Sequence, residues 1–95
     1  MGLFDLTGKR AFVVGGTRSI GKAITLGLAE AGADVAVAAR TEKDLAAIAE
    51  SIEAHNVRAA TVALDVSEIE KIPRAVEQIN EQLGGIDILV NVAGT

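Results

Sequence analysis

Four short apolar runs alternate along the chain with three segments of helical periodicity, and this alternation is the feature that most limits the fold. The apolar runs cover residues 10–14, 35–39, 59–64 and 86–90. Each run has the length and apolar content of a strand that is buried on both faces of a sheet. Strands and helices that alternate with short connections predict an α/β fold, in which right-handed crossovers wind helices around a doubly wound parallel sheet.

Apolar residues at intervals of three and four predict the helices. The first covers residues 19–31 and is followed by Gly32 as a C-terminal cap. The second begins after Thr41, whose spacing to Asp44 is that of a capping box. We expect both helices to turn an apolar stripe toward the sheet.

The third helix has a less regular start. Ser67 and Glu70 again have the spacing of a capping box, but Pro73 follows them. Proline lacks an N–H group, which is harmless only in the first turn of a helix. We therefore expect regular helix to begin near residues 70–72 and to stop at Gly84.

The composition excludes several classes of protein. The 95 residues include no Cys and one His, which leaves neither a disulfide framework nor a thiolate zinc site. The net charge of -4 and the dispersed basic residues argue against nucleic-acid binding. No signal peptide or membrane-spanning run is recognisable. We expect a single cytoplasmic domain over residues 1–95 that holds no metal.

The glycine-rich segment after the first apolar run is the strongest candidate site. Ligands of doubly wound parallel sheets bind outside the carboxyl ends of the strands. Residues 15–21 lie at such an end and lead directly into a helix, whose free N–H groups and dipole attract phosphate. Gly15 allows a sharp turn, Gly16 leaves backbone accessible, and Gly21 lets the helix pack close to the sheet. The segment predicts a nucleotide site.

Four motifs in matching order and spacing resemble the amino-terminal half of the short-chain dehydrogenase/reductase family. They are GGTRSIG after AFVV, VAVAAR, LDVS and IDILVNVAG, and together they span the chain. The resemblance implies a Rossmann-like sheet of strand order 3-2-1-4 that binds a dinucleotide. It also implies an oxidoreductase that reduces carbonyls or oxidises alcohols.

The resemblance assigns cofactor-binding residues within these motifs. Gly15, Ile20 and Gly21 fall on the glycine-rich loop of the family. Asp65 falls on the carboxylate that hydrogen-bonds the adenine amino group, with Val66 beside it. The predicted cofactor-binding residues are Gly15, Thr17, Arg18, Ser19, Ile20, Gly21, Arg40, Asp65, Val66, Asn91, Ala93 and Gly94.

Three residues depart from the family pattern. Val14 stands in place of Thr, Val92 in place of the second Asn, and Ser19 in place of the middle glycine of the loop. Ser19 adds bulk where the backbone approaches the pyrophosphate, although its hydroxyl can donate a hydrogen bond. We expect weaker cofactor binding than an intact glycine loop would give.

Charge favours NADP over NAD as the cofactor. An acid roughly 20 residues beyond the loop normally holds the ribose 2′-hydroxyl of NAD. Here the second apolar run ends in Ala39 and Arg40 follows it. With Arg18 in the loop, two guanidiniums can meet the 2′-phosphate of NADP. The alternatives are that both arginines are solvated loop charges, and that Asp65 serves only as a turn residue.

The chain has no residue for the proton transfer that the family performs. In the family, a Tyr aided by a Lys four residues later supplies the proton, and this sequence contains no Tyr. Complete members of the family are more than twice as long. We therefore expect an amino-terminal fragment that does not turn over alone.

Two other functions remain open: a dinucleotide-binding module without chemistry, and a structural fragment that assembles through its sheet. In the strand order 3-2-1-4, the fourth strand is an edge. This exposed edge carries the apolar side chains Ile86, Ile88, Val90 and Val92. We expect a homodimer that forms through this strand or through its covering helix, or pairing of the edge with a complementing carboxyl-terminal half.

Overall fold

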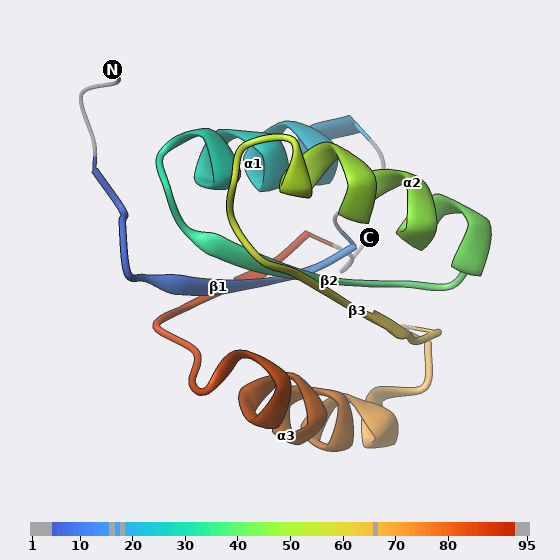
Figure 1. The fold of residues 1–95 in the computed structure, drawn as a ribbon. Helices are drawn as coiled ribbons and strands as arrows, with labels where there is room; N and C mark the ends of the chain where they lie inside the picture. The colour runs from blue at the N-terminus through green and yellow to red at the C-terminus, as the bar shows by residue number, and fades with distance from the viewer. Residues whose placement is uncertain (1–4, 16, 18, 66, 93–95) are drawn as a thin grey trace.

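Four parallel strands form one sheet in the order β3-β2-β1-β4, which confirms the predicted topology (Figure 1). The structure, a computed structural model, describes residues 5–15, 17, 19–65 and 67–92. The strands are β1 (Arg10–Val14), β2 (Asp34–Ala39), β3 (Ala59–Ala63) and β4 (Ile88–Asn91). The helices are α1 (Ser19–Glu30), α2 (Glu42–Glu53) and α3 (Ile72–Leu83), preceded by the short 3-10 helix η1 (Ile69–Lys71).

The helices lie in two layers. Figure 1 shows α1 and α2 on one face of the sheet and α3 on the other. Successive side chains of a strand point to opposite faces, so each strand contributes to two cores. Phe12 of β1 packs in the cluster that contains Ile79 of α3, while its neighbour Val13 packs in the cluster with Ile48 and Ile52 of α2. These five side chains are almost fully buried, so both faces of β1 are apolar as predicted.

The first two helices form where predicted, but the capping box of α2 does not. Thr41 is the N-cap of α2 and makes no side-chain cap hydrogen bond. Its backbone is extended, and its carbonyl oxygen accepts the N–H of Leu45 at 3.1 Å. The acidic Glu42 and Asp44 lie in the first turn, where the helix dipole favours negative charge.

The start of α3 confirms the prediction for Pro73 and corrects the one for Ser67. Pro73 lies in the first turn of α3, and η1 forms the irregular turn before it. Ser67 does not take part in a capping box with Glu70. Its N–H and hydroxyl instead both donate to Oδ1 of Asp65, at 3.0 and 2.7 Å. The hydroxyl of Ser67 is therefore bonded to the carboxylate two residues upstream rather than to the backbone of the following helix.

The fourth strand begins at Ile88, two residues later than predicted. Asp87 donates its N–H to the carbonyl oxygen of Arg10 at 2.7 Å, and its carboxylate accepts the N–H of Arg10 at 2.9 Å. The side chain of Asp87 thus takes a backbone donor that a strand residue would otherwise pair. The preceding Gly84 and Gly85 have φ values of 82° and 144°, which belong to a turn rather than a strand.

The strand β4 lies at the edge of the sheet, as predicted, and its apolar side chains differ in exposure. Ile86, Val90 and Val92 are half-buried because they pack against the two cores, and Ile88 is half-buried as well. The exposed large apolar side chain of this strand is Leu89, at 57%. The helix α3 packs against β1, β2 and β3.

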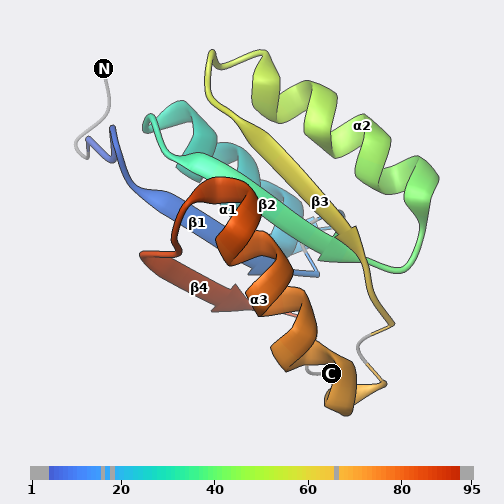
Figure 2. The same cartoon turned by 60° about the horizontal axis from the view of Figure 1, so that its bottom comes forward.

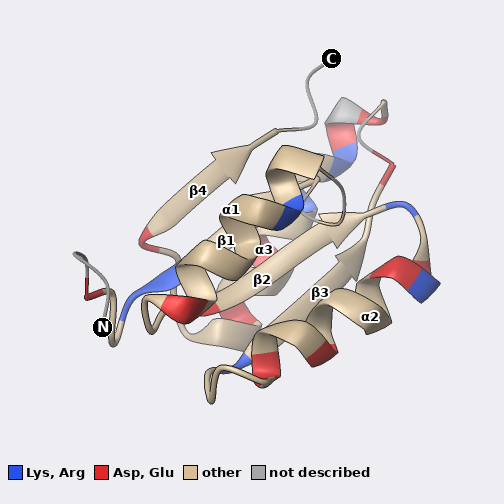
Figure 3. Ribbon diagram, turned by 90° about the horizontal axis from the view of Figure 1, so that it is seen from above, with Lys and Arg blue, Asp and Glu red and all other residues tan. Residues whose placement is uncertain are grey.

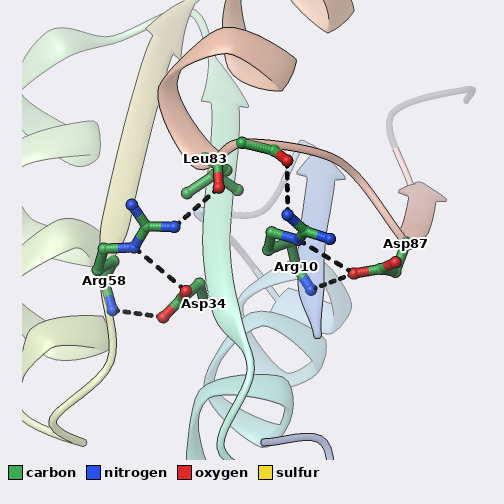
Figure 4. Close-up of polar contacts among 6 residues, drawn as sticks. Arg10, Asp34, Arg58, Leu83 and Asp87 are labelled. Carbon is green, nitrogen blue, oxygen red and sulfur yellow. Dashed lines mark hydrogen bonds and ion pairs between the residues drawn. The ribbon is translucent and has the colours of Figure 1, made fainter. Parts of the chain in front are cut away.

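Two arginine–aspartate pairs tie the end of α3 to the amino ends of the strands (Figure 4). Arg58 donates to Asp34 from its N–H and from Nε, at 2.9 and 3.2 Å, and from Nη2 to the carbonyl oxygen of Leu83 at 2.8 Å. Arg10 repeats the arrangement with Asp87 and donates from Nη1 to the carbonyl oxygen of Gly84. The carbonyl groups at the end of α3 thereby gain donors that the helix itself lacks.

Candidate functional site

The predicted cofactor-binding residues that the structure describes lie at the carboxyl ends of the four strands. Gly15 directly follows β1, Arg40 follows β2, and Asn91 is the last residue of β4. Asp65 comes two residues after β3. Figure 2 shows that all four strand arrows point the same way, so these residues gather at the end of the sheet where the strands finish. The predicted residues Arg18, Val66, Ala93 and Gly94 lie outside the described residues.

Gly21 brings the start of α1 into close contact with the ends of β1 and β4. A Cβ atom at Gly21 would overlap the carbonyl oxygen of Gly15 and would lie 2.9 Å from Cγ2 of Val92. Gly15 has a φ of 88°, and its N–H continues the sheet by donating to Ala38 at 2.8 Å. The chain therefore turns sharply at Gly15, and Gly21 must lack a side chain for α1 to begin there.

Ser19 has an unusual backbone conformation that the sequence did not reveal. It is the first residue of α1 and has a φ of 47°, in the left-handed region. Its side chain is exposed, and the neighbouring Ile20 is exposed at 71%. The sequence identified Ser19 by the bulk of its side chain, whereas the structure adds a torsional requirement at the same position.

The structure shows Asp65 as a turn residue, which is one of the two interpretations that the sequence left open. Its Oδ1 accepts both hydrogen bonds from Ser67, which makes it a turn residue. The hydrogen bond from the Ser67 hydroxyl is the main cause that lowers the pKa of Asp65, followed by the Ser67 N–H and, more weakly, by the charges of Arg40 and Lys71. An ionised carboxylate with Oδ2 outside these bonds can still accept a hydrogen bond from a ligand.

Arg40 lies close enough to Asp65 for their charges to interact. The connection from β2 to α2, blue in Figure 3, carries this exposed arginine. The positive charge of its guanidinium contributes to the lowered pKa of Asp65. The carboxyl edge of the sheet thus holds a cation after β2 and an anion after β3, which are suited to different parts of one polar ligand.

A small hollow lies beside the glycine loop, between α1 and α2. Its volume is about 150 Å³, and its lining residues are Thr17, Lys22, Asp44, Ala47, Ile48 and Ser51. Thr17 is a predicted site residue, whereas Lys22 was not among the predicted residues. Lys22 directly follows Gly21, so it places a cation one residue beyond the loop.

Within the described ranges, no three His, Cys, Asp or Glu side chains are grouped to hold a metal ion. In the same part of the chain, no helix is both long and apolar enough to cross a membrane.

Comparison with known proteins identifies the class that this fold and loop define. The family model described as short chain dehydrogenase matches residues 9–95. The chain therefore belongs to the short-chain dehydrogenase family, which confirms the resemblance seen in the sequence.

Individual relatives agree with this assignment. A short chain dehydrogenase of Pseudocercospora fijiensis is 44% identical over 90 residues, which are 95% of this chain and 29% of the relative. The L-sorbose reductase of Gluconobacter frateurii, complexed with NADPH and L-sorbose, has a TM-score of 0.88 at 39% identity. The match covers 97% of this chain and 35% of the reductase chain. Carveol dehydrogenase from Mycobacterium avium, in complex with NAD, has a TM-score of 0.87 at 32% identity. This match covers 97% of this chain and 38% of the dehydrogenase chain. The chain thus spans about a third of the length of these relatives.

Proposed function

We propose that this chain is the dinucleotide-binding part of a short-chain oxidoreductase and that it prefers NADP(H) to NAD(H). The observation that carries the proposal is the contact between Gly21, the carbonyl oxygen of Gly15 and Val92. It holds the amino end of α1 against the strand ends, where free N–H groups and the helix dipole favour a pyrophosphate. A side chain at Gly21 would push this end of α1 away from Gly15 and Val92, so the glycine present keeps the helix end where the cofactor would bind.

The remaining site residues suit the adenosine end of the cofactor. Asp65 offers a carboxylate acceptor for the adenine amino group, and its lowered pKa keeps it ionised at neutral pH. Arg40 is exposed and follows Ala39, where an NAD-binding protein of this fold would present an acid. A guanidinium at this position favours the doubly charged 2′-phosphate of NADP. The neighbours include complexes with NADPH and with NAD, so the preference rests on Arg40.

The bound cofactor would supply the hydride, which passes between its nicotinamide ring and a carbonyl or alcohol carbon. The described residues bind and orient the dinucleotide in this proposal. The 95 residues contain no Tyr, so the family's proton donor must come from another chain or segment. We expect the chain to bind NADPH without turning over a substrate.

A second function, assembly through the sheet, is favoured by the exposure of Leu89 on β4. The outer edge of β4 and this side chain would be covered if the strand paired with a second copy or with a complementing segment. Such pairing is compatible with cofactor binding, because the loops lie at the ends of the strands.

Calorimetric titration of the purified chain with NADPH and with NADH tests the proposed function. We expect NADPH to bind more tightly, and Arg40→Ala to weaken NADPH binding about ten-fold because a charge-assisted hydrogen bond is lost. NADH binding should change little. Lys43→Ala removes another exposed cation, three residues away in α2, and serves as the matched control. A folded chain that binds neither dinucleotide contradicts the proposal, and equal affinity for both contradicts the preference.

A further inference from the structure

Two residues other than glycine have a positive φ in the described ranges, and they differ in how well they tolerate it. They are Ser19, at 47°, and Asn56, at 62°. Asparagine adopts the left-handed region more readily than other residues with a side chain. Asn56 follows α2 in a turn, where this conformation is common. Ser19 has no such preference and lies at the start of α1, within the proposed cofactor loop.

The two family glycine positions at the start of α1 have different physical requirements. Position 21 is steric, because a Cβ atom there would overlap the carbonyl oxygen of Gly15. The requirement at position 19 is torsional, because the side chain is exposed and the backbone is left-handed. A glycine would satisfy the torsional requirement without strain, since it adopts positive and negative φ about equally. This chain has glycine at position 21 and serine at position 19.

Side-chain contacts do not hold Ser19 in its left-handed conformation. Its hydroxyl makes no hydrogen bond to any residue of the part that the structure describes, and α1 packs through other residues. Side chains that stabilise strained backbone elsewhere do so by hydrogen bonding or burial. The left-handed conformation of Ser19 therefore depends on the backbone of the loop alone, and a ligand that binds the loop in this conformation would favour it.

We propose that Ser19 is a positioning residue that sets the affinity of the glycine-rich loop for its dinucleotide, by making the left-handed loop conformation a minor one. This inference rests on the proposed function, and it concerns how tightly that site binds. A residue with a side chain populates the left-handed conformation about five to thirty times less than the right-handed one. The apparent affinity falls by the fraction of molecules that are competent to bind.

The test compares Ser19→Gly and Ser19→Ala with the unmodified chain, using NADPH as the probe and its fluorescence as the signal. Ser19→Gly should bind NADPH about five to thirty times more tightly, because glycine populates the left-handed conformation freely. Ser19→Ala keeps the torsional restriction and removes the hydroxyl, so its Kd should remain within about two-fold of the unmodified chain or be weaker. Far-UV circular dichroism checks that all three proteins are folded, so that a changed Kd reports on binding alone.

The Kd values of the variants show whether the backbone conformation of Ser19, or another property of the side chain, limits NADPH binding. Equal binding by the unmodified chain and Ser19→Gly overturns the inference while leaving the proposed function intact. A gain in Ser19→Ala that matches the gain in Ser19→Gly also overturns it, because the hydroxyl or its bulk would then be the cause. If no folded variant binds NADPH, the proposed function fails and the inference fails with it.

Discussion

At the scale of single residues, the glycine-rich loop shows what a sequence can and cannot predict. The role of Gly21 in close packing follows from its place between a strand and a helix, and the contact with Gly15 agrees with it. The left-handed conformation of Ser19 could not be predicted from residue type, because serine rarely adopts it. Only a comparison with the family's glycine indicated that the position was unusual.

We predict opposite effects for two glycine-to-alanine substitutions in the same helix. Gly21→Ala should destabilise the fold by about 1–3 kcal/mol, because its Cβ meets the backbone of Gly15 and the side chain of Val92. Gly27→Ala places its Cβ where no atom lies within 4 Å, on an exposed part of α1. It should stabilise by about 0.5–1 kcal/mol, since alanine restricts the unfolded chain.

Urea unfolding of both variants measures these effects, and NADPH titration of Gly27→Ala provides the control for binding. Gly27→Ala should leave the Kd for NADPH unchanged because it is remote from the loop, two turns further along α1. A Gly21→Ala variant as stable as the unmodified chain would show that α1 can move away from Gly15 without loss.

At the scale of elements, hydrophobic periodicity predicted which segments form strands and helices, while local side chains decided where they end. The four strands and three helices all form in the predicted order. Both capping boxes were wrong, and in the second Ser67 bonds to Asp65. The late start of β4 has a similar cause, because Asp87 bonds to Arg10. Such pairs depend on residues that are distant in sequence or compete locally, and periodicity does not report them.

The pairing of Asp87 with Arg10 predicts a loss of stability in acid. Hydrogen bonds from the N–H of Arg10, and then from its guanidinium, lower the pKa of Asp87 below its usual value of 3.8. A carboxyl group whose pKa is lower in the folded state contributes stability above its unfolded pKa. That contribution is lost as the pH falls below about 4 toward the folded pKa.

Urea midpoints measured at pH 7, 4 and 3 should therefore fall less steeply in Asp87→Asn than in the unmodified chain. The amide oxygen of asparagine can still accept the N–H of Arg10, so the variant should keep the start of β4. Asp5 and Asp65 also have lowered pKa values, so part of the acid sensitivity should remain in the variant. An unchanged pH dependence in Asp87→Asn would show that the pair with Arg10 adds no stability.

In the whole molecule, the proposed site and the arginine–aspartate pairs lie at opposite ends of the strands. The loops of the site lie at the carboxyl ends of the strands, and the arginine–aspartate pairs lie at the amino ends (Figure 4). The sequence predicted the first arrangement because parallel strands carry their loops to a common edge. It did not predict the second, since residues 10 and 87 become neighbours only when β1 pairs with β4.

The cover of the sheet is uneven, and this leads to a prediction about assembly. The α3 helix packs against β1, β2 and β3, while Leu89 of β4 is 57% exposed. A free strand edge beside an apolar side chain favours pairing with another strand. We predict that the chain sediments as a dimer at micromolar concentration and that Leu89→Lys shifts it toward monomer, because a charge there would have to be buried.

The control for this prediction lies on the opposite edge of the sheet. Ala63 is an exposed residue of β3, so Ala63→Lys adds the same charge without touching β4. It should leave the sedimentation coefficient unchanged, while Leu89→Lys lowers it. A well-folded monomer for the unmodified chain would contradict pairing through β4. A dimer that Leu89→Lys leaves intact would place the interface elsewhere, and a dimer lost only in Ala63→Lys would place it at β3.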